Sequence, residues 1–184
     1  MTAISNLHSI FEHGLLSHNE AHRLSIITDI SDPNVQNLRS IKRVNNISLH
    51  NYVPFYFSPR NPMLYVRQEM QNQIAFLSTD PRLLLDSSTI FSDGNAAAQN
   101  TNFYCGTPLL DELPWNIINA YYWNEFEDGK RIKCAEVLVY PRVEVQRILK
   151  IFCYSNQQTP LILQALPRNV NIPVLRSCTY RINP

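Results

Sequence analysis

Hydrophobic side chains recur at helical spacing near the start of the chain. Leu7, Ile10 and Phe11 stand three and four positions apart, which places them on one face of a helix. The pattern predicts a short helix within residues 6–16. Gly14 suits its end, because glycine readily adopts the left-handed conformation that closes many helices.

Longer apolar runs later in the chain predict strands. The strongest run is the centre of residues 133–142, where Val-Leu-Val follows Glu136 and Pro141 ends the run. Further strands are expected at residues 73–79, 83–86, 148–154 and 170–175. Helices are expected at residues 35–44 and 96–98 and within residues 110–123. Together these elements predict a chain that mixes helices and strands, with most strands in its middle and C-terminal half.

The segment of residues 52–65, Tyr-Val-Pro-Phe-Tyr-Phe-Ser-Pro-Arg-Asn-Pro-Met-Leu-Tyr, fits neither a regular strand nor a regular helix. Its three prolines remove backbone donors and fix φ, while most of the residues between them are large and apolar. One interpretation is a buried strand bent by its prolines. The other is a rigid aromatic platform that carries Arg60 and suits a flat or phosphorylated ligand.

Composition narrows the class of protein. A chain of 184 residues with 45% hydrophobic and 17% charged residues can bury a core, and we expect one domain over residues 1–184. No apolar run approaches the length of a membrane helix, and the start does not resemble a signal peptide, so we expect a cytoplasmic protein without membrane association. The net charge of +1 is too small to produce a long-range electrostatic attraction to nucleic acid. The basic clusters at residues 39–43 and 130–133 are read as solvated charge.

No metal site is expected. The four cysteines are far apart and form no C-x-x-C pair, and with four glycines the chain has no glycine-rich phosphate loop. His18 and His22 have the spacing of a helical zinc pair, but a metalloprotease would place glutamate directly after the first histidine. No third ligand is evident. A solvated polar helix is the preferred interpretation.

Two charged residues are candidates for chemistry. Glu136 opens the buried strand, and a desolvated carboxylate requires a partner. It either forms a strand-end salt bridge with Lys133 or Arg131, or is held against a sugar hydroxyl or a developing cation, as in glycosyl chemistry. Arg39, taken alone, is read as an exposed arginine on a helix.

Four segments, in this order, resemble the DarT family, the toxins of DarT–DarG toxin–antitoxin systems. They are residues 6–16, residues 52–65, Phe-Ser-Asp-Gly-Asn-Ala-Ala at 91–97 and Ala-Glu-Val-Leu-Val at 135–139. The resemblance implies an α+β, ADP-ribosyltransferase-like fold: two small packed sheets flanked by helices, with NAD in a central cleft. It implies a monomer that ADP-ribosylates thymine bases of single-stranded DNA, with NAD as co-substrate and a DarG-like macrodomain antitoxin as partner.

The resemblance also implies roles for individual residues. Glu136 and Arg39 correspond to the catalytic residues of the family, and Arg39 also to its NAD site. The stretch from His18 to Lys42 corresponds to the element that covers NAD, and the stretch from Asn95 to Glu136 to the loop that presents the substrate. The other implied NAD contacts are Thr2, Ser9, Leu16, Tyr56 and Met63. DNA contacts are expected at Asn95, where the substrate loop begins, at Tyr65 as a stacking face, and at Arg60 and Arg67 for phosphates.

The first residues depart from the family pattern. Members usually begin this region with Tyr-His-x-Thr, whose histidine contacts the adenosine side of NAD, whereas here Thr2 follows Met1 directly. One alternative is therefore a catalytically impaired homologue that binds nucleic acid. Transfer to guanine, RNA or protein is another, and a protein-interaction domain that presents the aromatic segment is a third.

Overall fold

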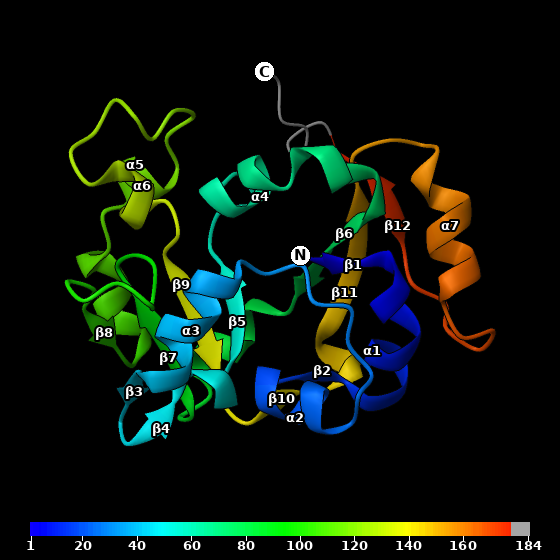
Figure 1. Cartoon of the computed structure of the whole chain (residues 1–184), viewed down its shortest axis with the longest axis horizontal. Helices are drawn as coiled ribbons and strands as arrows, with labels where there is room; N and C mark the ends of the chain where they lie inside the picture. Colours follow the sequence, from blue (N-terminus) through cyan, green and yellow to red (C-terminus); the bar gives the residue numbers. More distant parts are fainter. Residues whose placement is uncertain (178–184) are drawn as a thin grey trace.

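Two four-stranded sheets form the frame of the protein, whose computed structural model describes residues 1–177 (Figure 1). The first sheet has the order β1 (Thr2–Ala3), β6 (Ile74–Thr79), β11 (Ile148–Cys153), β12 (Val174–Arg176). The second has the order β5 (Val53–Tyr56), β9 (Glu136–Val139), β7 (Thr89–Ser92), β8 (Phe103–Tyr104). Neighbouring strands are antiparallel except β11 and β12, which are parallel. Short ladders join β2 (Leu15–Leu16) to β10 (Arg142–Val143) and β3 (Arg43–Val44) to β4 (Ile47–Ser48).

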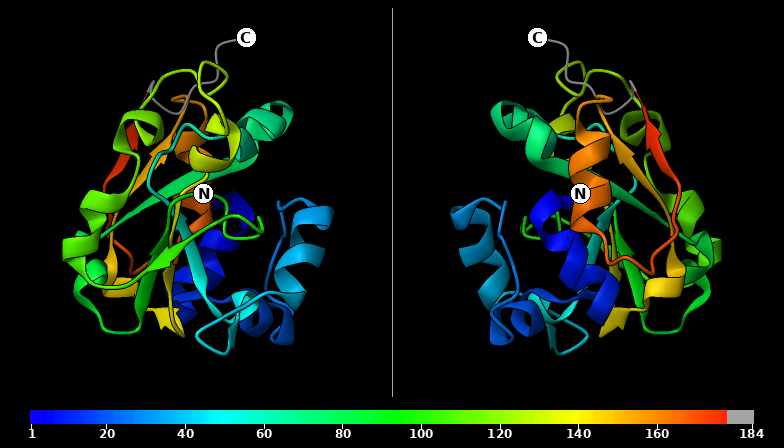
Figure 2. Two further views of the ribbon diagram at one scale, coloured as in Figure 1. Left: turned by 90° about the vertical axis from the view of Figure 1, so that its left-hand side faces the viewer. Right: turned by 90° about the vertical axis from the view of Figure 1, so that its right-hand side faces the viewer.

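Helices flank the two sheets. They are α1 (Leu7–His13), α2 (His18–Arg23), α3 (Pro33–Ile41), α4 (Pro62–Val66), α5 (Trp115–Ile118), α6 (Gly129–Ile132) and α7 (Gln158–Ala165). Turns of 3₁₀ helix are η1 (Ile4–Asn6), η2 (Leu49–Asn51), η3 (Gln68–Gln73), η4 (Pro81–Leu85), η5 (Thr107–Glu112) and η6 (Val145–Arg147). Figure 1 shows α1 and α7 beside the first sheet, and Figure 2 shows α3 standing off one side of the strands. The predicted α+β class, with two small sheets flanked by helices, is confirmed.

The first sheet has a hydrophobic cluster on each face. Alternate residues of β6 point to opposite sides. Ala75 joins a cluster with Leu7 of α1 and Ile162 of α7, whereas Ile74 joins a cluster with Leu64 of α4. The sheet therefore separates α1 and α7 from α4.

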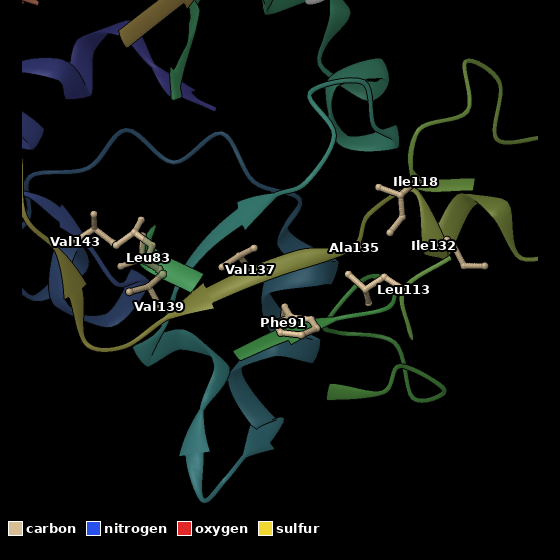
Figure 3. Close-up of a cluster of buried hydrophobic side chains, with 10 residues drawn as sticks. Leu83, Phe91, Leu113, Ile118, Ile132, Ala135, Val137, Val139 and Val143 are labelled. Atoms are coloured by element: carbon tan, nitrogen blue, oxygen red, sulfur yellow. The ribbon is translucent and has the colours of Figure 1, made fainter. Parts of the chain in front are cut away.

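β9 is buried on both faces, as its sequence predicts. Val137 and Val139 join a cluster with Phe91 of β7 (Figure 3), whereas Leu138 belongs to a different cluster. Because side chains alternate along a strand, Glu136 points to the side of Leu138 and away from the cluster of Val137. The alternation of side chains along β9 therefore places the Glu136 carboxylate on the face opposite to Val137 and Val139.

The aromatic–proline segment contains both a strand and a helix, so the prediction that it fits neither is wrong. Pro54 lies in β5, the outermost strand of its sheet, where a residue without an N–H is tolerated. Pro62 takes the first position of α4, where no intrahelical N–H is needed. The side-chain oxygen of Asn61 accepts the N–H of Leu64 at 3.0 Å and caps that helix.

Most of the other predicted elements are confirmed within a few residues. The strands expected at 73–79, 148–154 and 170–175 correspond to β6, β11 and β12, and the helix expected at 35–44 corresponds to α3. α3 begins two residues earlier, at Pro33, because the Asp32 carboxylate accepts the N–H groups of its first turn. β7 was not predicted.

α1 confirms the helix expected within residues 6–16. It ends at Gly14, which has a φ of 83° and donates its N–H to the Ile10 carbonyl at 2.8 Å. A Cβ at this position would lie 2.6 Å from the Val143 carbonyl oxygen. Gly14 is therefore required both by its conformation and by the close approach of β10.

Two predicted elements are wrong. Residues 83–86 are not a strand: the first three belong to η4 and Asp86 caps its end, because Asp80 accepts the N–H of Arg82 at 2.9 Å and starts a turn there. Residues 96–98 form a turn rather than a helix, and the Ala98 N–H donates to the Asn95 carbonyl at 3.0 Å.

The helix expected within residues 110–123 is confined to the four residues of α5. Lys133 explains its short length. This side chain is 1% exposed, and its ammonium donates to the carbonyl oxygens of Ile118 and Ala120 just after the helix. Lys133 is therefore a buried anchor for the loop and not part of a solvated cluster.

In the part of the chain that the structure describes, no helix combines the length and apolarity needed to span a bilayer. Cys105, Cys134 and Cys153 are free thiols. The fourth cysteine, Cys178, lies outside the described residues.

Candidate active site

A cavity of about 680 Å³ lies between the second sheet and the segment that precedes α3. Its walls come from β1, α1, residues 26–32, α3, β5, α4 and the loop that leads into β9. The sequence-predicted residues that line it are Thr2, Ser9, Leu16, Arg39, Tyr56, Met63, Asn95 and Glu136. The fold therefore gathers one site from residues that span most of the chain.

Glu136 is the most tightly held acid of this cavity. It is 2% exposed, and its carboxylate accepts hydrogen bonds from Arg39 Nη1 at 2.9 and 3.1 Å and from the Ala96 N–H at 2.9 Å. Its own N–H donates to the Ser92 hydroxyl at 3.1 Å. Sequence reasoning missed Ser92 and Ala96. Ala96 acts through its backbone, which leaves no side-chain signal, although both residues lie in the segment of residues 91–97.

Arg39 is the partner of Glu136. It is 6% exposed, so the prediction of an exposed arginine is wrong, and so is the prediction that Lys133 or Arg131 pairs with Glu136. Lys133 is bound to backbone carbonyls and Arg131 to Asp93 at 2.8 Å. The pair joins α3 to β9 across the cavity and holds two opposite charges out of water.

Two further polar side chains line the cavity next to Glu136. Burial, and then the nearby Glu136 charge, raise the pKa of Tyr56 well above its usual value, so its hydroxyl stays protonated. Burial, again with a contribution from Glu136, raises the pKa of Cys134 to about 12. Cys134 is therefore a neutral thiol rather than a nucleophilic thiolate.

Asn6 holds the segment that covers the cavity. Its side-chain amide donates to the Thr28 carbonyl at 2.9 Å and accepts the Thr28 N–H at 2.7 Å. The same amide nitrogen also donates to the Thr2 hydroxyl at 3.1 Å. Sequence reasoning named Asn6 only as part of the opening segment. Its pairing with Thr28 could not be read from the sequence.

Asn6→Ala is expected to loosen this segment. The substitution removes both hydrogen bonds to the Thr28 backbone, and lost hydrogen bonds of buried groups cost about 1–3 kcal/mol each. Amide hydrogen exchange at Thr28 should become at least about tenfold faster. Asn19→Ala is the matched control, because Asn19 makes its 2.7 Å bond to Asn51 on an exposed surface. Unchanged exchange at Thr28 would show that Asn6 does not hold the segment.

Arg67 binds the same segment two to three residues further along the chain. Its guanidinium donates to the carbonyl oxygens of Ile30 at 2.7 Å and Ser31 at 2.8 Å. Arg67 does not line the cavity. Arg67 therefore has a structural contact with this segment, and its role in DNA binding stays a prediction.

The loop of residues 93–102 is fixed to α6 by Arg131. The guanidinium binds Asp93 at 2.8 Å and Thr101 at 3.2 Å, and the Arg131 carbonyl accepts the Asn95 N–H at 2.9 Å. The loop carries Ala96, whose N–H binds Glu136. Arg131 is therefore a tertiary link, not solvated charge as the sequence predicts.

Gly94→Ala is expected to displace Arg131. A Cβ at this position would lie 2.3 Å from Arg131 Nη1, so the guanidinium would have to leave Asp93. Overpacking of this kind costs about 1–3 kcal/mol, which urea denaturation would measure. Gln99→Ala in the exposed part of the same loop is the control and should leave stability unchanged. Equal stability of both variants would contradict the link.

Arg60 and Tyr65 lie outside the cavity, on an aromatic surface. The Arg60 guanidinium lies 3.8 Å from the centre of the Tyr121 ring, and Tyr65 packs edge-on against Trp123 with ring centres 5.9 Å apart. Tyr65, Tyr121 and the neighbouring Tyr122 are about half exposed. Their roles in DNA binding stay predictions.

The two histidines of α2 meet an acidic residue that the sequence did not single out. His22 Nε2 lies 3.6 Å and His18 Nδ1 lies 4.0 Å from Asp29 Oδ2. The expectation that no third ligand exists for this pair is therefore wrong. Burial, together with the neighbouring His50 and His22, lowers the pKa of His18 to about 4, so that imidazole is neutral at pH 7.

Comparison with known proteins shows the family to which this chain belongs. The family model described as ssDNA thymidine ADP-ribosyltransferase, DarT, matches residues 1–178. A DNA ADP-ribosyl transferase from Thermus sp. (strain 2.9) is 30% identical over 179 residues, which cover 90% of this chain and 85% of the relative. A DNA ADP-ribosyl transferase–DNA ADP-ribosyl glycohydrolase fusion protein from Thermosipho africanus is 31% identical over 192 residues. That match covers 100% of this chain and 49% of the fusion, so the chain spans about half of that relative.

Solved structures show the same similarity. Thermus sp. 2.9 DarT in complex with ADP-ribosylated ssDNA superposes with a TM-score of 0.85 at 27% identity, over 98% of this chain and 93% of that one. The same protein in complex with NAD⁺ gives a TM-score of 0.79 at 27% identity, over 98% and 94% of the two chains.

Proposed function

Because this chain belongs to the DarT family of ssDNA thymidine ADP-ribosyltransferases, we propose that it transfers ADP-ribose from NAD to thymine bases of single-stranded DNA. The observation that carries the proposal is the buried Glu136–Arg39 pair in a cavity of about 680 Å³. A cavity of this size can enclose most of a dinucleotide. Thr2, Ser9, Leu16, Tyr56 and Met63 line it and are the proposed NAD contacts.

Glu136 is the proposed catalytic carboxylate. Breaking the bond between the ribose anomeric carbon and nicotinamide leaves positive charge on the sugar ring, as glycoside cleavage does. A carboxylate that accepts a hydrogen bond from the ribose 2′-hydroxyl offsets this charge. The Ala96 N–H and Arg39 already fix the carboxylate, so little reorganisation is required during the reaction.

Thymine N3 is the proposed acceptor. Nicotinamide leaves with the electron pair of the broken bond, N3 forms the new bond to the anomeric carbon, and the N3 proton is released to solvent. An arginine side chain is not deprotonated in proteins, so the proposed role of Arg39 is that of a positive charge beside the reacting groups rather than of the base. A single strand is required because N3 is paired in a duplex.

The exposed aromatic surface is the proposed path of the DNA strand. Tyr65 and Tyr121 offer faces on which bases stack, and Arg60 adds positive charge for phosphates. Asn95, at the cavity wall, would contact the target nucleotide.

Tyr121→Ala is expected to weaken DNA binding without affecting NAD binding. Stacking of one base on an aromatic side chain is worth about 1–3 kcal/mol, so the dissociation constant of a thymine oligonucleotide should rise about 5- to 150-fold. Fluorescence anisotropy would measure it. Leu161→Ala on α7, which removes a side chain of similar exposure (52% against 51%), should bind DNA like the parent. Equal loss in both variants would contradict this path.

A labelled-NAD assay on oligonucleotides tests the proposed function. Single strands that contain thymine should be labelled, and thymine-free strands and duplexes should not. Mass spectrometry of digested nucleosides identifies the modified base, so labelling of guanine, RNA or protein would replace thymine as the acceptor. Calorimetry with NAD distinguishes an impaired homologue, which would bind DNA but not NAD.

The biological setting follows from the Thermosipho relative, whose name joins the transferase to a DNA ADP-ribosyl glycohydrolase. We propose that residues 1–184 form one catalytic domain, that the protein acts as a monomeric toxin in the cytoplasm, where NAD and DNA meet, and that a DarG-like macrodomain is its antitoxin. Co-expression with such a macrodomain should restore growth of cells that the transferase inhibits.

A further inference from the structure

We propose that His18, His22 and Asp29 form a binding site for Zn²⁺ at the edge of the cavity. One donor atom from each residue lies within 4.8 Å of the other two. The proposal does not depend on the transferase reaction, and it accounts for a histidine pair that the proposed function leaves unused.

The geometry requires only small movements to bind an ion. Zinc–nitrogen and zinc–oxygen bonds of about 2.0–2.1 Å at tetrahedral angles place neighbouring donor atoms about 3.3 Å apart. His22 Nε2 and His18 Nδ1 lie 3.6 and 4.0 Å from the shared oxygen of Asp29. The two histidine–carboxylate distances need to shorten by about 0.3 and 0.7 Å to reach this value, and the three donor atoms already lie within 4.8 Å of one another.

The surroundings of the site already orient two of its ligands. The other carboxylate oxygen of Asp29, Oδ1, accepts the N–H of Ser31 at 2.8 Å, which turns Oδ2 toward the histidines. The His18 ring lies against the ring of His50, with centres 4.1 Å apart. A hydrogen bond to a ligating carboxylate, such as that from Ser31, is typical of metal sites, where it fixes the ligand orientation.

The donor set selects the class of ion. Imidazole nitrogens suit zinc and its first-row neighbours, whereas Mg²⁺ and Ca²⁺ prefer sites made of oxygen alone. Three protein ligands leave a fourth position open. His18 and Asp29 line the cavity, so a ligand from the cavity side can reach that position.

A bound ion would connect two parts of the stretch from His18 to Asp32, which covers the cavity. His18 and His22 lie on α2, and Asp29 lies in the segment of residues 26–32 that lines the cavity. Zn²⁺ would link α2 to this segment and add to the attachments made by Asn6, Ser9 and Arg67. A ligand that binds only the folded chain also raises its melting temperature.

The chain contains its own control. Glu12 lies between two histidines on a different surface, with His8 3.2 Å from Oε1 and His13 3.9 Å from Oε2. This cluster also has two histidines and one carboxylate, but the two histidines approach different oxygens. This cluster therefore tests whether zinc binding requires donor atoms that converge on one point, or only two histidines near a carboxylate.

Calorimetric titration of the untagged, chelator-treated chain with Zn²⁺ tests the site, and Co²⁺ serves as a spectroscopic probe. We expect one Zn²⁺ per chain, a tetrahedral Co²⁺ absorption spectrum, and a higher melting temperature with zinc. His22→Gln and Asp29→Asn should each lower zinc affinity at least about tenfold and remove the thermal shift. The double variant His8→Gln/His13→Gln should bind like the parent.

Several results would overturn the site. The parent chain could show no zinc binding, the His22→Gln and Asp29→Asn variants could bind unchanged, or the control variant could lose binding. Circular dichroism of each metal-free variant shows whether it is folded, and His22 is exposed, so its loss should leave the fold intact. No NAD or DNA is present in the titration, so its outcome is separate from that of the transferase assay.

Discussion

Glu136→Gln is expected to lower the rate of ADP-ribosyl transfer by at least about 10²–10³-fold, the loss seen when one preorganised electrostatic group is removed. Glutamine keeps the shape of the side chain and can still accept the Ala96 N–H. It no longer carries the negative charge that offsets the developing positive charge on ribose. Single-turnover labelling of a thymine oligonucleotide would measure the rate, and calorimetry should show NAD affinity within a few-fold of the parent.

Glu144→Gln is the control for this experiment. Glu144 forms an exposed ion pair with Arg142 at 2.8 Å, so its substitution removes the same charge from the surface. Its rate should equal that of the parent. If Glu136→Gln also labels DNA at the parent rate, Glu136 is not the catalytic carboxylate.

Arg39→Met is expected to have the largest effect on stability. The substitution leaves the Glu136 carboxylate, 2% exposed, without its opposite charge. Breaking a buried pair by removing one partner typically lowers the free energy of unfolding by about 3–5 kcal/mol. Urea denaturation at pH 7 would measure the loss.

The double variant Arg39→Met/Glu136→Gln separates charge from packing. If the loss comes from an uncompensated charge, the double variant should be more stable than Arg39→Met alone. Arg142→Met, which breaks the exposed pair with Glu144, should cost less than about 1 kcal/mol. A double variant as unstable as Arg39→Met would show that Arg39 stabilises through packing instead.

The sequence predicted the fold best where apolar residues are buried on one or both faces of a strand. β6, β9 and β11 follow from such runs. It failed at Leu83–Leu85, where an equally apolar run forms a 3₁₀ turn because Asp80 and Pro81 fix its start. β7 went unnoticed because its four residues are too few to show a period.

The site was predicted less completely, because much of it depends on contacts between distant residues. Arg39 and Glu136 are 97 residues apart, and only the family resemblance connected them. The hydrogen bonds between Asn6 and Thr28 join residues 22 positions apart and leave no pattern in the sequence. The Ala96 N–H is a backbone group, which every residue except proline has. Asp29 lies seven residues after His22, beyond α2, where no helical spacing connects the two.

The hydrogen bonds from Asn6 and Arg67 to the segment that covers the cavity have a consequence for how this enzyme can evolve. Asn6 and Arg67 bind backbone atoms of Thr28, Ile30 and Ser31 and none of their side chains. Substitutions at these three positions therefore keep the bonds from Asn6 and Arg67, and only the exposed bond from Ser5 to the Thr28 hydroxyl depends on a side chain of the three. The cover can diversify its chemistry toward the bound nucleotide while its anchoring is inherited unchanged, provided that the two anchors outside the segment persist.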